Sequence, residues 1–357
     1  VEMADGLYLG QLVFATRRLL SAYDPRLPDA EYGYEHFGYF VVMDGRWEAE
    51  ARRLFPHIGI PVAERPQPLP RPEKLTAFTF ADPPDGNCDD RLLAELHEDM
   101  EGRETILDLL KFYSDELKEH LEGDSPYFAR LHELFNRGRA PATMGGFLRG
   151  ALISFRSQGL LRVFDRNILN MAWGLGRLFT PWTGKPLEGI DLARLAELTD
   201  GHETGHLPTF WGTNTYSLRT ARRRSVGHLM KAANIWTIEA SAGERRAFGF
   251  DLKGFFFIAR QGISVNGANR GKTVFQLNYR WPKLRTFPPD NYCIDEVVQI
   301  AEGLYLGQLT YATELLKKYD PARAASEYDY RVFGYFLLMD EDWHRQRLNI
   351  GLDLDNT

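Results

Sequence analysis

The chain has 357 residues, a formal net charge of −6 and an apolar fraction of 44%. These values are typical of a folded protein with a sizeable core and argue against a disordered chain. Basic residues are scattered apart from the run 222–224, so nucleic acid is not expected as a partner, because binding normally needs a larger basic face. The two cysteines and the lack of a long apolar run predict a cytoplasmic protein without a transmembrane segment.

A stretch of the first 50 residues recurs near the end of the chain. Both copies contain Gly-Leu-Tyr-Leu-Gly-Gln-Leu, at residues 6–12 and 303–309, and later Phe-Gly-Tyr-Phe, at 37–40 and 333–336. Each copy has two strand-like segments joined by a turn-rich connection with Asp-Pro, which predicts a duplicated strand-pair unit at both ends of the chain. Residues 291–296 precede the second copy and have no counterpart before the first, so we expect the natural polypeptide to extend upstream.

The first copy, in residues 1–60, cannot be a domain by itself. An isolated pair of strands is only marginally stable in water, so these strands must join a sheet from the rest of the chain or from another chain. A homo-oligomer through strand edges is one such arrangement, since exposed edges readily pair. Five prolines in the following residues predict a stiff, extended linker at 61–74 and therefore a domain boundary there.

Residues 75–200 are predicted to be mainly helical, with a short strand opening the segment. Within 89–135, leucines recur at three- and four-residue spacing with charges between them, which is typical of amphipathic helices. Ser125 before a proline predicts the N-terminal cap of one of them. A glycine-containing strand is predicted at 146–155, and the apolar residues 160–179 predict a buried helix or a pair of strands.

Residues 201–357 have mainly a period of two, which predicts antiparallel strands. Strand-like segments lie at 209–219, 248–259 and 273–281, with turn-type residues between them. Successive amphipathic strands with tight turns favour an antiparallel curved sheet or a closed β-barrel. The predicted fold is therefore α+β, with a helical segment inserted into the barrel and the duplicated strand-pair unit at both ends.

Two short motifs resemble signatures of small β-barrel families of unknown function. Residues 146–150, Gly-Phe-Leu-Arg-Gly, resemble Gly-x-Trp-x-Gly, and residues 182–185, Trp-Thr-Gly-Lys, resemble Trp-x-Gly-Lys. Both are broadly similar to the calycin superfamily, which includes lipocalins and fatty-acid-binding proteins. The first motif departs from the pattern at Phe147 and Leu148, where those families favour a nearby tryptophan. The resemblance implies an up-and-down, calycin-like barrel with an apolar cavity, and it transfers no catalytic residue.

The segment 273–281 has an aromatic side and a polar side, because alternate residues of a strand point in opposite directions. If the aromatic side packs on helices, the polar side faces the cavity, where an arginine can hold a carboxylate or phosphate. If the aromatic side lines the cavity, the polar side meets solvent. With residues from neighbouring predicted strands, the candidate ligand-binding residues are Gln276, Asn278, Arg280, Gln308, Tyr305, Trp211 and Asn214.

Residues 202–206 read His-Glu-Thr-Gly-His, which has the H-E-x-x-H form of zinc peptidases. In those enzymes both histidines bind the metal from one helical face, and the glutamate is the general base. Gly205 within the motif and Pro208 after it disfavour a continuous helix, so we interpret the segment as a loop. His202 and His206 are the candidate metal ligands.

The leading hypothesis is non-enzymatic binding of a small apolar or amphipathic ligand, such as a lipid-like molecule, haem or pigment, in a β-barrel cavity. One alternative is a metal-dependent hydrolase that uses His202 and His206, or another enzyme that acts on a hydrophobic substrate in the same cavity. A third hypothesis is an interaction protein that uses the duplicated strands as an assembly edge. The sequence identifies no particular cofactor and does not decide whether a reaction is catalysed.

Overall fold

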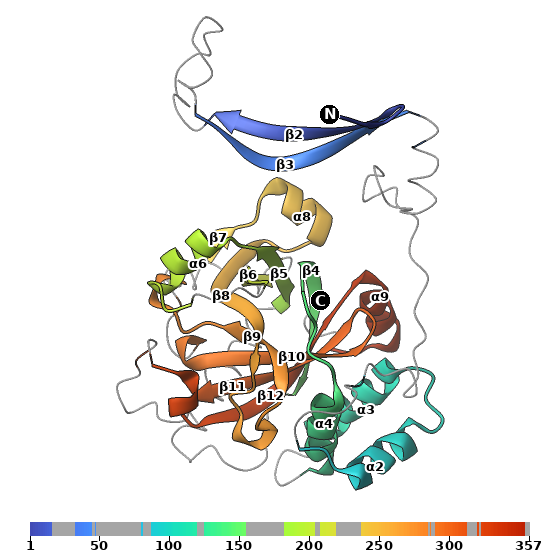
Figure 1. Cartoon of the computed structure of the whole chain (residues 1–357). Helices are drawn as coiled ribbons and strands as arrows, with labels where there is room; N and C mark the ends of the chain where they lie inside the picture. Colours follow the sequence, from blue (N-terminus) through green and yellow to red (C-terminus); the bar gives the residue numbers. More distant parts are fainter. Residues whose placement is uncertain are drawn as a thin grey trace, which may run out of the picture. The chain divides into compact units, whose positions relative to one another are not determined.

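The computed structural model describes two compact units, Val1–Gln67 and Pro68–Thr357, which we treat separately (Figure 1). The predicted linker at 61–74 and the apolar segment at 160–179 lie outside the described residues. The described residues are 1–15, 33–44, 47, 80, 87–119, 125–154, 182–203, 208–218, 237–284, 286, 290–312, 320 and 323–353.

The larger unit is built on a closed antiparallel β-barrel (Figure 1). Each strand pairs with the next described barrel strand along the chain, and β12 pairs with β4 to close the ring. The predicted α+β fold with a closed antiparallel barrel is confirmed, and the strands follow the up-and-down order that the calycin resemblance implies. The eight barrel strands are β4 (Gly146–Ser154), β5 (Trp182–Gly189), β6 (Phe210–Tyr216), β8 (Leu252–Ile263), β9 (Thr273–Asn278), β10 (Cys293–Ala301), β11 (Leu304–Ala312) and β12 (Tyr330–Met339). A short strand, β7 (Thr237–Glu239), also pairs with β8.

Alternation along the strands divides the apolar side chains between the barrel interior and its outer face. On β11, Tyr305 and Leu309 contact the interior cluster, whereas Leu304 and Leu306 belong to a separate core on the outer face. We use the name inner cluster for the buried side chains that fill the barrel: Met144, Leu148, Leu152, Leu187, Phe257, Ala259, Phe275, Leu277, Tyr279, Cys293, Val297, Tyr311, Phe333, Phe336 and Leu338.

Three helices cover the outer face of the barrel beside β10, β11, β12 and β4 (Figure 1). They are α2 (Asp90–Met100), α3 (Ile106–Glu119) and α4 (Pro126–Arg137), and they confirm the helical pattern predicted at 89–135. The predicted cap Ser125 accepts a hydrogen bond from the backbone N–H of Tyr127. Two further helices are α6 (Leu192–Thr199) and α9 (Glu341–Ile350). No helix among the described residues is both long and apolar enough to cross a membrane.

The strand predicted at 248–259 begins later, at Leu252, because the preceding residues form helix α8 (Ala242–Phe248). Ser241 and Glu244 form a capping box at its start, and Gly249 ends it with a φ of 79°. Both signals are present in the sequence, but the prediction followed the aromatic residues and began the strand at 248. Strand β5 was not predicted either, because Gly184 and Pro186 are unfavourable inside strands.

The smaller unit contains an antiparallel sheet whose main strand pair has the same register as β11 and β12. Leu7 lies opposite Met43 as Leu304 lies opposite Met339. In both pairs the register shifts immediately after a leucine, which is Leu12 in the first pair and Leu309 in the second. The three strands are β1 (Glu2–Ala4), β2 (Leu7–Ala15) and β3 (Tyr34–Met43).

Candidate functional site

The barrel encloses a buried polar cluster centred on Lys185 of β5. Its ammonium group donates to Asn214 Oδ1 at 2.6 Å and to the Tyr279 hydroxyl at 2.5 Å, and it lies 3.4 Å from Asp295 Oδ2. The Tyr279 hydroxyl in turn donates to Asp295 Oδ2 at 2.9 Å. The side chains of Lys185 and Asp295 are only 3% and 5% exposed, and burial raises the pKa of the Asp295 carboxyl. The carboxylate therefore depends on these two donors.

Four aromatic rings surround the same ammonium group. Its nitrogen lies 5.1 Å from the ring centroid of Phe257, 5.3 Å from those of Trp182 and Tyr279, and 5.5 Å from that of Phe336. At these distances the faces of the rings stabilise a cation. The Trp-x-Gly-Lys motif thus places its tryptophan and its lysine together inside the barrel.

Gly184, between that tryptophan and lysine, allows β5 to approach β4 closely. Its φ is 148°, and a Cβ at this position would lie 2.1 Å from the carbonyl oxygen of Leu148. A side chain there would force the two strands apart, so the glycine is required by the close backbone approach that positions Lys185.

Glu296, the residue after Asp295, points to the outer face of the barrel, because neighbouring residues of a strand face opposite ways. It is buried and accepts hydrogen bonds from Ser264 Oγ at 2.7 Å, the Val265 N–H at 2.6 Å and Gln308 Nε2 at 2.6 Å. Burial raises the pKa of its carboxyl group. These hydrogen bonds connect β10 and β11 to the segment that follows β8. Glu296 and Gln308 therefore have a structural role in the barrel wall.

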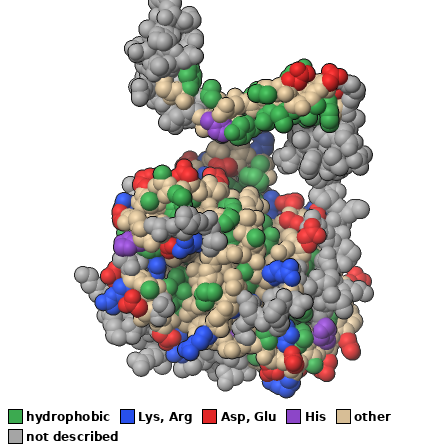
Figure 2. Space-filling model, in the orientation of Figure 1, with side chains coloured by type: hydrophobic (Ala, Val, Ile, Leu, Met, Phe, Trp, Pro, Cys, Tyr) green, Lys and Arg blue, Asp and Glu red, His purple; other side chains and the backbone are tan. Residues whose placement is uncertain are grey.

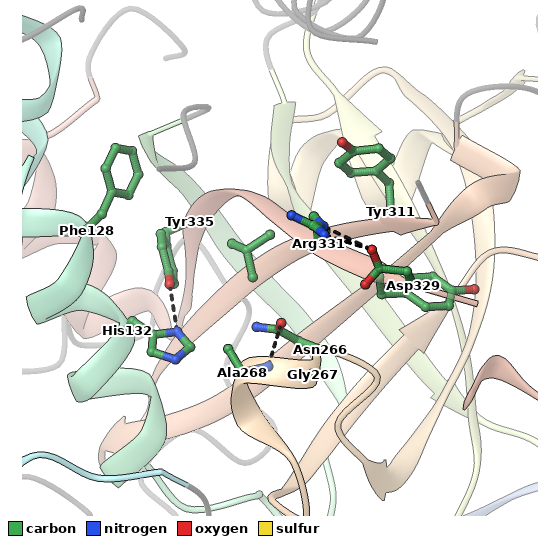
Figure 3. Close-up of a pocket in the computed structure, with 11 residues that line it drawn as sticks. Phe128, His132, Asn266, Gly267, Ala268, Tyr311, Asp329, Arg331 and Tyr335 are labelled. Atoms are coloured by element: carbon green, nitrogen blue, oxygen red, sulfur yellow. Dashed lines mark hydrogen bonds and ion pairs between the residues drawn. The ribbon is translucent and has the colours of Figure 1, made fainter. Parts of the chain in front are cut away.

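A pocket of about 390 Å³ lies on the outer face of the barrel (Figure 3). It is bordered by helix α4, the first half of β12 and the connection between β8 and β9. Its rim is exposed to solvent at residues 267–268, Asp329 and Arg331. Its walls include Phe128, His132, Asn266, Tyr330, Val332 and Tyr335.

The inner end of this pocket is polar but carries no charge at neutral pH. The Tyr335 hydroxyl lies 3.4 Å from His132 Nδ1, and burial lowers the pKa of His132 to about 4 and raises the pKa of Tyr335. At the rim, Arg331 forms an ion pair with Asp329 at 3.0 Å, so the two charges balance each other (Figure 3). The pocket therefore presents aromatic walls with neutral hydrogen-bonding groups at one end.

The depressed pKa of His132 predicts a loss of stability in acid. Because its folded pKa of about 4 lies below the unfolded value of about 6.5, its contribution is complete above pH 6.5 and is lost as the pH falls towards 4. We expect His132→Asn to remove between about 1 and 3 kcal/mol of the decrease in unfolding free energy between pH 7 and 4. Urea denaturation of both proteins at several pH values measures this difference.

His344→Asn is the matched comparison, since burial also lowers the pKa of His344, to about 3, and this residue lies outside the pocket. Each single variant is expected to flatten the acid limb of the stability curve, and the double variant to flatten it further. An acid limb that is unchanged in His132→Asn would contradict the account of a neutral imidazole in the pocket.

The predicted polar stripe of β9 lies on the outer face, because Phe275, Leu277 and Tyr279 on its other side fill the barrel. Asn278 and Arg280 are nevertheless buried, and both contact protein atoms. Asn278 Oδ1 accepts from the backbone N–H of Arg280 at 3.1 Å, and a guanidinium nitrogen of Arg280 donates to the carbonyl of residue 323 at 3.1 Å. Gln276 donates to the carbonyl of residue 263 at 2.7 Å. A ligand-binding role for this stripe stays a prediction.

The remaining predicted ligand-binding residues do not form one site. Asn214 belongs to the Lys185 cluster, and Tyr305 packs against the inner cluster. Gln308 lies on the outer face as a donor to Glu296, and Trp211 stacks on Phe256 with ring centroids 5.2 Å apart. The structure thus brings two of these four residues to the barrel interior and leaves two on the outer face. Their role in binding a ligand also stays a prediction.

The first two residues of the His-Glu-x-x-His motif lie beyond the end of α6 at Thr199, and His206 lies outside the described residues. His202 stacks on Trp281 with ring centroids 5.8 Å apart, and Glu203 forms an ion pair with Arg260. Within the part of the chain that the structure describes, no group of three or more His, Cys, Asp or Glu side chains is arranged to hold a metal ion. The metal site at His202 and His206 stays a prediction.

Comparisons with known proteins found no match to a protein-family model, to a curated protein or to a solved structure. Candidate functions therefore depend on the chemistry of the described residues. Local sequence patterns do not indicate the Lys185 cluster, although the Trp-x-Gly-Lys motif contains that lysine. The local patterns do not indicate the pocket either, because the polar pair at its inner end, His132 and Tyr335, is separated by 203 positions in the chain.

Proposed function

We propose that the protein binds a small amphipathic ligand, without catalysis, in the pocket between α4, β12 and the β8–β9 connection. The observation that carries the proposal is the combination of aromatic walls with a neutral polar end in a volume of about 390 Å³. Ligand sites are usually of about 300–1,000 Å³, mostly apolar, with a few well-placed polar groups. We place the ligand in this outer pocket, and not inside the barrel as the sequence pattern suggested, because side chains of the inner cluster occupy the interior.

The lining residues also indicate the chemistry of the ligand. Phe128, Tyr330 and Val332 provide apolar contact area for a ring or a short acyl chain. The groups that can hydrogen-bond at the inner end belong to neutral side chains, so a buried hydroxyl, carbonyl or amide of the ligand is favoured there. A buried charge would lose its hydration without gaining an opposite charge. A polar, uncharged end of the ligand is expected at the rim, where Arg331 and Asp329 balance each other.

We expect the neutral fluorescent probe N-phenyl-1-naphthylamine to bind in this pocket, and Ala268→Trp to weaken its binding by at least about tenfold, because the indole would occupy the space. Ala268 is exposed at the pocket rim, so the larger side chain fits without disturbing the core. Arg270→Trp is the control, since Arg270 is exposed in the same connection but does not line the pocket. A fluorescence titration of the three proteins measures the change. Equal affinity in all three would place the probe elsewhere and contradict the proposal.

The alternative function is a metal-dependent hydrolase that uses His202 and His206, and it rests on the His-Glu-x-x-His sequence. In the described structure Glu203, which would be the general base, is already ion-paired with Arg260 and lies 4.0 Å from a guanidinium nitrogen of Arg280. The carboxylate would have to leave these two cations to act on a metal-bound water, so we rank this function second. Stoichiometric zinc that is lost in His202→Ala would reverse the ranking.

We also infer that residues 1–50 and 298–346 are two copies of one strand-pair unit. Support comes from the shared sequence segments and from the shared strand register with its shift at the same position. The copies differ in how far their side chains are buried.

A further inference from the structure

The two strand pairs have the same pairing but very different burial. In the barrel, four consecutive residues of β12 are at most 3% exposed: Tyr335, Phe336, Leu337 and Leu338. Their counterparts in β3 are 64%, 43%, 48% and 52% exposed: Tyr39, Phe40, Val41 and Val42. Because consecutive residues of a strand point to opposite sides, both faces of β3 are uncovered. Figure 2 shows hydrophobic side chains gathered along this strand pair.

The side chains within the smaller unit already have the arrangement of a barrel wall. The ring of Phe336 lies over Gly307 so closely that a Cβ there would be 2.2 Å from the ring. The ring of Phe40 lies over Gly10 with the same 2.2 Å separation. A glycine covered by a cross-strand aromatic ring is thus kept in both copies, although only the barrel copy has an interior for the ring to fill.

The contact that follows the second strand is also the same in both copies. Trp343 donates its indole N–H to the carbonyl of Glu302 at 2.8 Å, and Trp47 donates to the carbonyl of Asp5 at 2.8 Å. The smaller unit therefore does not adopt a different fold that would suit an isolated domain. It keeps a geometry that in the larger unit belongs to a closed barrel.

The edges of the two strand pairs differ as well. In the barrel, β11 pairs with β10 over its length and β12 pairs with β4, so both edges are occupied. Among the described residues of the smaller unit, the strand beside β2 on that side is the short β1, where Glu2 lies opposite Tyr8 as Gln299 lies opposite Tyr305. Strand β3 is at the edge of the described sheet. Within the described part of this unit, two faces and most of two edges are therefore left to be covered.

We propose that β2 and β3 are a docking surface that closes a second barrel of the same kind as the larger unit. The partner is a barrel wall that lacks its last two strands, with edges like those of β10 and β4, an apolar interior and a helical layer outside. Such a wall covers both faces and both edges at once. A second copy of this chain fits less well. Its larger unit is already closed by β11 and β12, and a contact between β2–β3 of two copies would cover only one face or one edge of each strand pair. This inference is independent of the proposed ligand pocket.

A transplant within the full chain tests whether the docking surface can close such a wall. In the variant, residues 303–343 are replaced by a second copy of residues 6–47. We expect the barrel still to unfold in one cooperative transition, with a midpoint lowered by about 10–20 °C, because several buried side chains change. The buried exchanges are Thr310→Val, Tyr311→Phe, Leu337→Val, Leu338→Val and Asp342→Arg. Calorimetry and near-ultraviolet circular dichroism follow the transition.

The control transplant uses residues 7–48 at the same place, which shifts every residue by one position. A shift of one residue moves each side chain to the opposite face of the strand, so the cooperative transition should be lost. If the transplant in the native register behaves like this shifted control, the strand pair is not a barrel-closing element and the proposal fails.

Light scattering of the intact chain over a range of concentrations tests the choice of partner. Because a second copy is not the expected partner, the chain should remain monomeric at micromolar concentration. A dimer that Val42→Glu abolishes would assign the exposed face to self-association and overturn the proposal. Val42 is 52% exposed, so the substitution should leave the monomer folded.

Discussion

Replacing Lys185 with methionine is expected to lower the free energy of unfolding by about 3–5 kcal/mol, because it leaves the buried carboxylate of Asp295 without its cation. Methionine keeps most of the length and volume of the lysine side chain, so the lost charge and hydrogen bonds account for most of the change. Tyr279 still donates one hydrogen bond to the carboxylate, at 2.9 Å, but a single neutral donor does not replace an ammonium group. Guanidinium denaturation at pH 7 measures the loss.

The double variant with Asp295→Asn is the control, since it removes both charges. It should recover part of the stability, because an unpaired buried charge costs more than the absence of the pair. In Lys185→Met alone, the pKa of Asp295 rises further above its unfolded value. A carboxyl whose folded pKa is raised loses stability as the pH increases, so this variant should be less destabilised at pH 5 than at pH 8. A loss below about 1 kcal/mol would be typical of a solvent-exposed pair and would contradict the buried site.

Gly307→Ala is expected to lower the free energy of unfolding by about 1–3 kcal/mol, the usual cost of overpacking a core. The added methyl group would lie 2.2 Å from the ring of Phe336. That ring is 1% exposed and packs edge-on against Trp182, with centroids 5.7 Å apart, so it cannot move aside. The measurement is again chemical denaturation, followed by the near-ultraviolet signal of the barrel aromatics.

Gly10→Ala is the matched variant in the smaller unit. Its methyl group would meet the ring of Phe40 at the same 2.2 Å, but this ring is 43% exposed and can rotate away. We therefore expect a change within about 0.5 kcal/mol, since alanine also lowers the entropy of the unfolded chain. An equally large loss at both glycines would show that Phe40 is held in place, and would contradict the description of an uncovered strand pair.

Much of the barrel could be predicted from local sequence patterns. The period of two in residues 304–312 predicts Tyr305 and Leu309 on one face of β11 and Leu306 on the other, and the structure shows this division. The leucine spacing in 89–135 predicted α2, α3 and α4 because each helix must bury one face. These features depend on residues that are close in the chain, so the spacing of the apolar residues is sufficient to predict them.

The site residues depend on contacts that no local pattern contains. Lys185 and Asp295 are 110 positions apart, and they meet because the barrel closes. The sequence distinguishes an aromatic face and a polar face of β9. Which of the two faces points into the barrel depends on the side that the helices cover. The helices cover the outer face beside β10–β12 and β4, so the aromatic side of β9 fills the barrel. The pocket likewise exists only where α4 crosses the outer face of β12.

Native mass spectrometry of gently purified protein, compared with the Ala268→Trp variant, tests the proposed ligand binding most directly. If the ligand occupies this pocket, the protein should retain one small molecule per chain, which is released on denaturation and is absent from the variant. A protein with no bound molecule that also fails to take up added probe, or a molecule retained equally by both proteins, would contradict binding in the pocket beside α4.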